Sequence, residues 1–271
     1  MNACEKDARS KLNSETPLYS ELDIDYQQAY SGPYKDLSYY GDDAIVIAAI
    51  KENIITGFGR PVVAFGDENR IKKEFNRLYD ISRNIRFLDY LEGGRLSAAS
   101  KFLLQKGLTA EPVFTQIIDL TKSEKELYSD LRKSFKQLIK QQDCYQYSLN
   151  NLRQLHFLRH GETRSRETWD IQQKMIQEKQ AFVVGHASNT EGALVLIYYN
   201  EYSAYYASVG ANVNAHSALW SAIWEAKNNG CKTFEIGEQL FFGDEKQVRI
   251  SNFKRGFGGQ TKVRLLIKDE Q

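Results

Sequence analysis

The sequence predicts an α/β (α+β) protein of two lobes, each with a mixed, mostly antiparallel sheet flanked by helices. Three observations lead to this fold class. Apolar β-branched runs alternate with segments of helical periodicity along the chain. Three strand candidates joined by short connections lie between Ala181 and Ser208, which is typical of an antiparallel meander. A length of 271 residues suggests about two domains, and the two halves resemble each other in their coarse order of elements.

The first half of the chain, residues 1–120, is predicted to form a shortened lobe. Residues 1–16 are polar and carry no predicted element. Ile71, Phe75 and Leu78 recur at helical spacing, and short apolar runs lie on either side of that helix. The predicted order is strand, strand, helix, strand, helix, strand, at Ile45–Ile50, Ile54–Phe65, Ile71–Ile81, Ile85–Tyr90, Ser97–Gln105 and Val113–Leu120.

The second half, residues 121–271, is predicted to form a second lobe. It opens on Ser123-Glu-Lys-Glu126, a capping box that predicts a helix with a basic face to about Gln141. The elements predicted after it are a strand at Tyr145–Leu149, helices at Leu152–Arg159 and Arg164–Glu178, strands at Ala181–His186, Ala193–Tyr199 and Ser203–Ser208, a helix at Ser217–Asn228, and strands at Thr233–Ile236 and Lys262–Ile267.

The segment Ser251–Gln260 carries the densest functional signal of the chain. Three glycines within four positions allow a sharp turn and a close approach of the backbone to a ligand. Lys254 and Arg255 add positive charge, and Phe253 and Phe257 add flat apolar surfaces. Exposed amides, fixed cations and a stacking wall suit a phosphate-bearing substrate. The same composition also fits a glycine-rich hairpin with solvated cations, so both interpretations stay open.

The second half resembles a known family. Helices, a meander and a final helix, strand and strand follow the order of an acyltransferase domain of the GNAT superfamily. Residues 115–267 resemble the FemABX-type acyltransferases, a duplicated-GNAT family that includes the aminoacyl-tRNA-dependent enzymes of peptidoglycan bridge synthesis. The first half matches in element order alone. The matching segments are Leu131–Lys140, Thr163–Trp169, Ala204–Ala211, Trp224–Gly230, Phe234–Gly237 and, most specifically, Phe253–Gly259.

The resemblance implies two catalytic residues. In the family, the lysine that matches Lys254 meets the activated donor and offsets developing negative charge. This role is chemically sound, because acyl transfer passes through an oxyanion and a fixed cation there can be worth several kcal/mol. Glu238 follows the predicted strand at Thr233–Ile236 and is a candidate proton acceptor, although its position favours a solvated loop carboxylate.

Further residues are candidates for substrate binding. Arg164 and Arg166 open a predicted helix, where guanidinium groups and backbone amides can share a phosphate, unless both are ordinary surface arginines. Tyr205 and Tyr206 point to opposite faces of a strand, so at most one lines a cleft. The predicted substrate-binding set is Arg164, Arg166, Trp169, Tyr206, Arg255, Phe257 and Gly258.

The function that the resemblance implies is N-acyl transfer. An aminoacyl or acyl group would pass from an activated donor to an amine of a phosphate-bearing cell-envelope precursor, such as a nucleotide-linked amino sugar or a muropeptide. The donor is aminoacyl-tRNA or acyl-CoA, with no tightly bound cofactor. The CoA signature Q/R-x-x-G-x-G/A before a helix is missing, because Arg255–Gln260 ends in Gln and precedes a strand. This favours aminoacyl-tRNA; the alternative is an acyl-CoA-dependent N-acetyltransferase of polysaccharide biosynthesis.

Two other classes of function stay open. Leu158-Arg-His-Gly-Glu-Thr163 is similar to the signature of histidine phosphatases, and Gly185-His-Ala187 is similar to their second histidine segment. That signature ends a first strand, whereas here it follows a helical pattern. A non-catalytic binding protein is the other possibility, since the first lobe is short. No metal site is predicted, because His156 and His160 at helical spacing have no set of Cys or acidic partners.

Composition limits the partners. The net charge is +1, so no global field attracts DNA, and contact with a tRNA acceptor end would have to be local. Three widely spaced cysteines favour a reducing compartment. We therefore expect a cytoplasmic protein without stable membrane insertion, since no run approaches 18 apolar residues and the N-terminus lacks an apolar signal region.

Overall fold

The computed structural model describes residues 24–188 and 191–270. Contacts divide them into two compact units, residues 24–114 with 263–270 (unit 1) and residues 115–188 with 191–262 (unit 2). Strands β8 (Thr109–Asp119) and β14 (Gln260–Lys268) carry the chain from one unit to the other. The predicted division after residue 120 therefore needs correction at the C-terminal end. The end of β14 belongs to unit 1, because Leu265–Ile267 pair with β7 (Phe87–Asp89).

Unit 1 is built from short strands around its own apolar core. Two three-stranded sheets have the orders β1-β4-β5 and β2-β3-β6. Ile71, Phe75 and Leu78 face the core as their spacing predicts. The elements besides β7 are α2 (Ile24–Ser31), β1 (Lys35–Asp36), β2 (Tyr39–Tyr40), β3 (Ala44–Ile47), β4 (Ala49–Lys51), β5 (Ile54–Thr56), β6 (Val63–Gly66), α3 (Glu68–Ile81), a 3-10 turn (Glu92–Gly94) and α4 (Ala98–Gln105).

One predicted strand of unit 1 is divided in two. The segment Ile54–Phe65 forms β5 and β6 with a turn between them. In that turn the Gly57 N–H donates to the Arg60 carbonyl. Phe58 has a left-handed backbone (φ 56°) and is 1% exposed, so its ring anchors the turn in the core. The apolar pattern therefore predicts the burial correctly but not the turn that interrupts the strand.

The sheet of unit 2 contains the predicted meander. Its strands besides β8 are β9 (Tyr145–Gln146), β10 (Ala181–Ala187), β11 (Gly192–Tyr199), β12 (Ser203–Ala211) and β13 (Thr233–Glu238), in the order β8-β13-β12-β11-β10-β9. All neighbours are antiparallel except β12 and β13, which are parallel. The β12–β13 pairing ends at Tyr205 and Glu235, although β12 continues to Ala211. The two strands therefore part after Tyr205, the third of the nine residues of β12.

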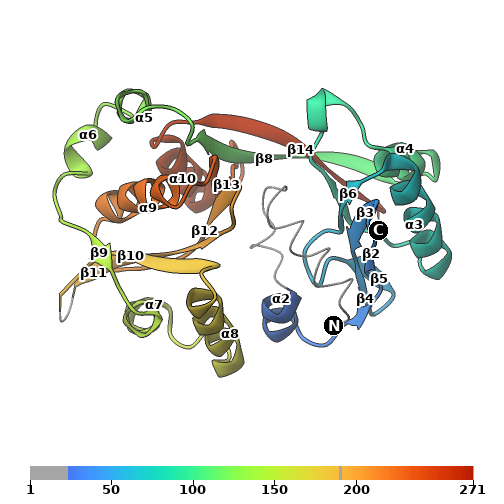
Figure 1. Ribbon diagram of the computed structural model, residues 1–271, viewed down its shortest axis with the longest axis horizontal. Helices are drawn as coiled ribbons and strands as arrows, with labels where there is room; N and C mark the ends of the chain where they lie inside the picture. The colour runs from blue at the N-terminus through green and yellow to red at the C-terminus, as the bar shows by residue number, and fades with distance from the viewer. Residues whose placement is uncertain (1–23, 189–190, 271) are drawn as a thin grey trace. The chain divides into compact units, whose positions relative to one another are not determined.

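Helices cover both faces of this sheet, as Figure 1 shows for α9 and α10 on one face and α7 and α8 on the other. Helix α9 (His216–Asn228) packs on the face that carries Val195 and Ile197. Helices α7 (Leu149–His160) and α8 (Arg166–Gln177) pack on the face that carries Leu194 and Leu196. The alternation along β11 follows from the two-residue period of a strand that is buried on both sides.

The predicted helix from Ser123 to Gln141 is two short helices, α5 (Glu124–Asp130) and α6 (Phe135–Leu138). The predicted capping box at its start is present, with Ser123 and Glu126 bonded reciprocally. The helix stops because Leu131 is extended (ψ 139°) and the Arg132 N–H donates to the Gly256 carbonyl at 2.9 Å. The predicted basic face is therefore interrupted.

Sequence analysis did not predict helix α10 (Glu245–Arg255). Asp244 caps it by accepting from the backbone of Lys246 and Gln247. Ser251–Arg255, which was assigned to a glycine-rich turn, forms the end of this helix, and the turn begins only at Gly256. Across residues 24–188 and 191–270, no helix has both the length and the apolar character needed to cross a membrane.

Candidate functional site

Lys254 lies on the last turn of α10, and its side chain reaches the end of β13. Its Nζ donates to the Glu238 carbonyl at 3.2 Å. A Cβ added to Gly237 would lie 3.5 Å from Lys254 Nζ and 3.6 Å from the Tyr205 hydroxyl. Gly237 has φ 95°, beside the irregularity in the β13–β8 pairing. Lys254 and Tyr205 therefore converge on one glycine, close to the point where β12 and β13 part.

The charge of Lys254 is set by opposing effects. Burial lowers the pKa of its ammonium group below the ordinary value of 10.5, and the nearby carboxylates of Glu238 and Glu235 act in the other direction. Glu235 is 4% exposed and accepts a hydrogen bond of 2.6 Å from the Thr115 hydroxyl. A desolvated cation beside a buried carboxylate is the kind of environment found at functional sites.

Tyr205 and Glu235 were missed as site residues. Tyr205 packs on the α7–α8 face of the sheet, whereas the predicted Tyr206 packs on the α9 face, where burial raises the pKa of its phenol. The structure thus brings the other tyrosine of the pair to Lys254. A signal for Glu235 was present in the sequence, because a carboxylate within the apolar strand Thr233–Ile236 is rarely buried without a partner.

The glycines of the Gly256–Gly259 turn are needed for packing of the chain against itself. A Cβ on Gly258 would lie 2.8 Å from the Asp130 Cβ, and the Gly258 carbonyl accepts from Gln116. Phe257 is 1% exposed and packs edge to face against Phe135 and Phe253, with ring centroids 5.2 Å apart in each pair. The prediction that Phe257 offers its ring to a substrate is therefore wrong, because protein atoms surround that ring, whereas the predicted role of the half-buried Gly258 stays a prediction.

Arg255 and Glu238 keep candidate roles with altered geometry. The Arg255 guanidinium donates to Gln239 and Asn252 and lies 4.7 Å from the Phe241 ring centre, so it orders the loop between β13 and α10. Glu238 is exposed, and its carbonyl rather than its carboxylate binds Lys254. Their predicted roles in substrate binding and proton transfer stay predictions.

The two arginines that were predicted to share a phosphate at the start of α8 have separate partners. Arg164 donates to the Ser208 hydroxyl at 2.8 Å and lies 5.0 Å from the centre of Trp169, which is itself 5% exposed. Arg166 points to solvent and pairs with Asp170 at 3.7 Å. Arg164 therefore ties α8 to β12, and the two arginines do not converge. A shared phosphate at this helix start stays a prediction that the geometry does not favour.

The segment that is similar to the phosphatase signature lies in a helical context. His160 is the last residue of α7, and Gly161 ends that helix. In a histidine phosphatase the signature would follow a strand, so this alternative loses its structural basis. Among the residues that the structure describes, no group of three or more His, Cys, Asp or Glu side chains is arranged to hold a metal ion.

No family model matches the sequence, and no curated protein matches it. Solved structures do share the fold. FemX has a TM-score of 0.70 at 10% identity, over 98% of this chain and 96% of its own. The C-terminal domain (DUF2156) of a putative lysylphosphatidylglycerol synthetase from Agrobacterium fabrum has a TM-score of 0.61 at 14% identity, over 100% of this chain and 93% of its own. A conserved protein of unknown function from Bacteroides thetaiotaomicron has a TM-score of 0.60 at 11% identity, over 99% of this chain and 98% of its own. The chain therefore has the same fold as FemX, which confirms the fold that the resemblance to FemABX-type proteins implies.

Proposed function

Starting from a FemABX-type, GNAT-like fold, we propose that this protein is an N-acyltransferase. It moves an aminoacyl or acyl group from an activated donor to an amine of a phosphate-bearing cell-envelope precursor. The observation that carries the proposal is Lys254, a desolvated cation that lies, like the Tyr205 hydroxyl, beside Gly237 and near the point where β12 and β13 part. The likeness to FemX supports the same class of reaction.

In the proposed reaction the acceptor amine attacks the acyl carbonyl and forms a new C–N bond. The carbonyl oxygen becomes an oxyanion, which the Lys254 ammonium group stabilises by several kcal/mol. The intermediate collapses by breaking the ester or thioester bond, and the donor's alcohol or thiol leaves. The amine loses a proton, for which the exposed Glu238 carboxylate is the proposed acceptor, and this proton passes on to the departing oxygen or sulfur. The acyl group thus passes directly to the amine without a covalent enzyme intermediate.

We favour aminoacyl-tRNA as the donor. In ordinary GNAT enzymes the CoA pyrophosphate binds at the start of the helix that corresponds to α9. In this chain the His216 N–H already donates to Asn214 at 2.8 Å, and the His216 ring packs 4.2 Å from the centre of Phe135. A helix start with an internal acceptor and an aromatic neighbour is a poor anion site. The near-zero net charge limits the tRNA contact to the acceptor end.

The experiment is a transfer assay in which the purified protein is incubated with each class of acyl donor in turn. Labelled aminoacyl-tRNA or acetyl-CoA is mixed with nucleotide-linked amino sugars and muropeptides, and the labelled amide is measured. We expect product from aminoacyl-tRNA, at a rate that falls steeply with salt because phosphate contacts release counterions. Product from acetyl-CoA alone would support the acyl-CoA-dependent N-acetyltransferase instead. Binding of the precursors without any transfer would indicate a non-catalytic binding protein.

A further inference from the structure

A pocket of about 210 Å³ lies between α7 and α8, and the proposed transfer does not use it. Pockets for drug-sized ligands are larger, at about 300–1,000 Å³, so the occupant is a small molecule. The residues around it are Asn150, Arg153, Gln154, His156, Phe157, Gly161, Glu162, Thr163 and Trp169.

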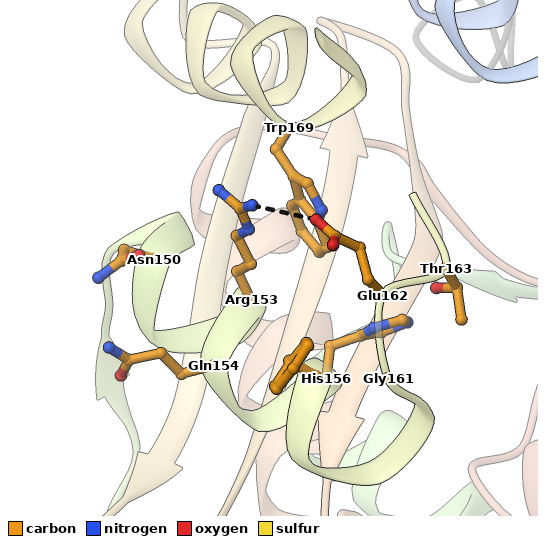
Figure 2. Close-up of a pocket in the computed structure, with 9 residues that line it drawn as sticks. Asn150, Arg153, Gln154, His156, Gly161, Glu162, Thr163 and Trp169 are labelled. Carbon is orange, nitrogen blue, oxygen red and sulfur yellow. Dashed lines mark ion pairs between the residues drawn. The ribbon is translucent and has the colours of Figure 1, made fainter. Parts of the chain in front are cut away.

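Two opposite charges meet at this pocket. Arg153 and Glu162 approach to 3.7 Å, and Figure 2 shows this ion pair drawn across Trp169. Their side chains are 41% and 66% exposed. A pair this long and exposed is weak, so each group is available to a ligand charge in place of the other. The planar Arg153 guanidinium is suited to a carboxylate, and the Glu162 carboxylate to an ammonium group.

The pocket lining includes one largely buried histidine, His156. His156 is 8% exposed and lies edge to face against Trp169, with ring centroids 5.8 Å apart. Among the described residues, no protein atom hydrogen-bonds to the imidazole of His156, and its ring nitrogens are not fully enclosed, so they are open to water or to a ligand. Burial, with the charges of Arg164 and His160, lowers the pKa of His156 to about 4, so at neutral pH the ring offers one donor and one acceptor. A ligand in the pocket would hydrogen-bond to this ring in place of water.

The remaining surface of the pocket is apolar. Phe157 is 58% exposed, which is unusual for so large a hydrophobic side chain, and its ring borders the same cavity as Trp169. Asn150 and Gln154 lie on the same helix and add amide groups at the rim. The pocket thus combines one cation, one anion, one imidazole open to a ligand and an aromatic wall within a small volume.

We propose that the α7–α8 pocket binds a small zwitterion of the free α-amino acid class. Arg153 takes the carboxylate, Glu162 takes the ammonium group, His156 hydrogen-bonds from the inner wall, and Phe157 and Trp169 cover an apolar side chain. A simple anion uses only Arg153 and a simple amine only Glu162, whereas a zwitterion satisfies both. The assignment is independent of the transfer reaction and does not involve Lys254.

The test is direct binding of L-leucine to the full-length protein by calorimetry, compared with two analogues that each lack one charge. These are 4-methylpentanoate, which lacks the amine, and 3-methylbutylamine, which lacks the carboxylate. We expect leucine to bind at least tenfold more tightly than either, because each analogue leaves one charged group unpaired. In spectra of protein labelled at histidine nitrogens, leucine should shift the His156 imidazole signals. Equal binding of leucine and 4-methylpentanoate would overturn the zwitterion assignment.

Two variants test which charged side chain binds which charged group of the ligand. Arg153→Ala should weaken leucine about tenfold or more, and Glu162→Gln should weaken leucine but leave 4-methylpentanoate unchanged. The matched controls Lys174→Ala and Glu178→Gln alter an exposed pair of nearly the same length, 3.8 Å, on α8 outside the pocket lining. These controls should bind leucine like the wild type. The proposal fails if leucine does not bind, or if the control variants weaken it as much as the pocket variants.

Discussion

Replacing Gly256 by alanine tests whether the glycine-rich turn is shaped by packing. Gly256 has φ −64° and ψ −18°, which any residue adopts, so backbone strain does not enter. An added Cβ would lie 2.2 Å from the Phe135 ring, whereas ordinary contact begins at 3.4 Å. The Phe135 ring is held by His216 and Phe257 at centroid distances of 4.2 and 5.2 Å, so it cannot move aside freely. Overpacking a core costs about 1–3 kcal/mol, and we expect the upper end of that range here.

The measurement is urea unfolding followed by intrinsic fluorescence, in which a loss of about 3 kcal/mol lowers the midpoint by roughly 1 M or more. The same substitution in a Phe135→Leu background tests whether the clash with the Phe135 ring causes this loss of stability. In Phe135→Leu the clashing ring atoms are gone, so Gly256→Ala should cost less than about 1 kcal/mol there, and the coupling between the two sites should be about 2 kcal/mol. An equal cost in both backgrounds would refute the packing explanation and return the turn to a ligand-binding interpretation.

Three further predictions concern titration and chemistry. Because His156 is neutral in the folded protein, the unfolded state binds its proton more readily, and the free energy of unfolding should fall by on the order of 2 kcal/mol as the pH falls from about 6.5 to about 4. Urea unfolding at several pH values should show this dependence in the wild type and not in His156→Gln. Wild type and His160→Ala should both lack phosphate-ester hydrolysis, and activity that disappears with His160 would restore the phosphatase interpretation. Glu235 raises the pKa of Lys254, so Glu235→Gln should move the alkaline fall of the transfer rate to lower pH; an unchanged pH profile would exclude a role for the Lys254 charge.

The sequence predicted the fold where periodicity and capping agree. The meander from β10 to β12, helices α7 to α9 and the capping box at Ser123 all follow from local pattern. Elements that depend on distant partners were missed. The break at Leu131 requires the Gly256 carbonyl, which lies far away in sequence. Helix α10 lacks a clear apolar stripe, and of its residues only Ser251 is buried, so no periodic pattern in the sequence predicts this helix.

The candidate site was predicted in part for the same reason. Lys254 was found because its local motif resembles that of a family. Phe257 was misplaced, because composition does not show that its ring packs against Phe135, a residue from a separate helix. Tyr205 could not be chosen over Tyr206 by strand alternation, since both faces of this sheet are covered by helices. The direction of a side chain relative to a distant lysine is a tertiary property that one sequence does not contain.

The rate of acyl transfer by Lys254→Ala tests the central claim most directly. Single-turnover transfer is measured for wild type, Lys254→Ala and the matched control Lys246→Ala, which removes an exposed lysine from the first turn of the same helix. The account predicts a fall of about 10² or more for Lys254→Ala with an intact fold, and a wild-type rate for Lys246→Ala. A folded Lys254→Ala that transfers the acyl group at the wild-type rate would contradict it.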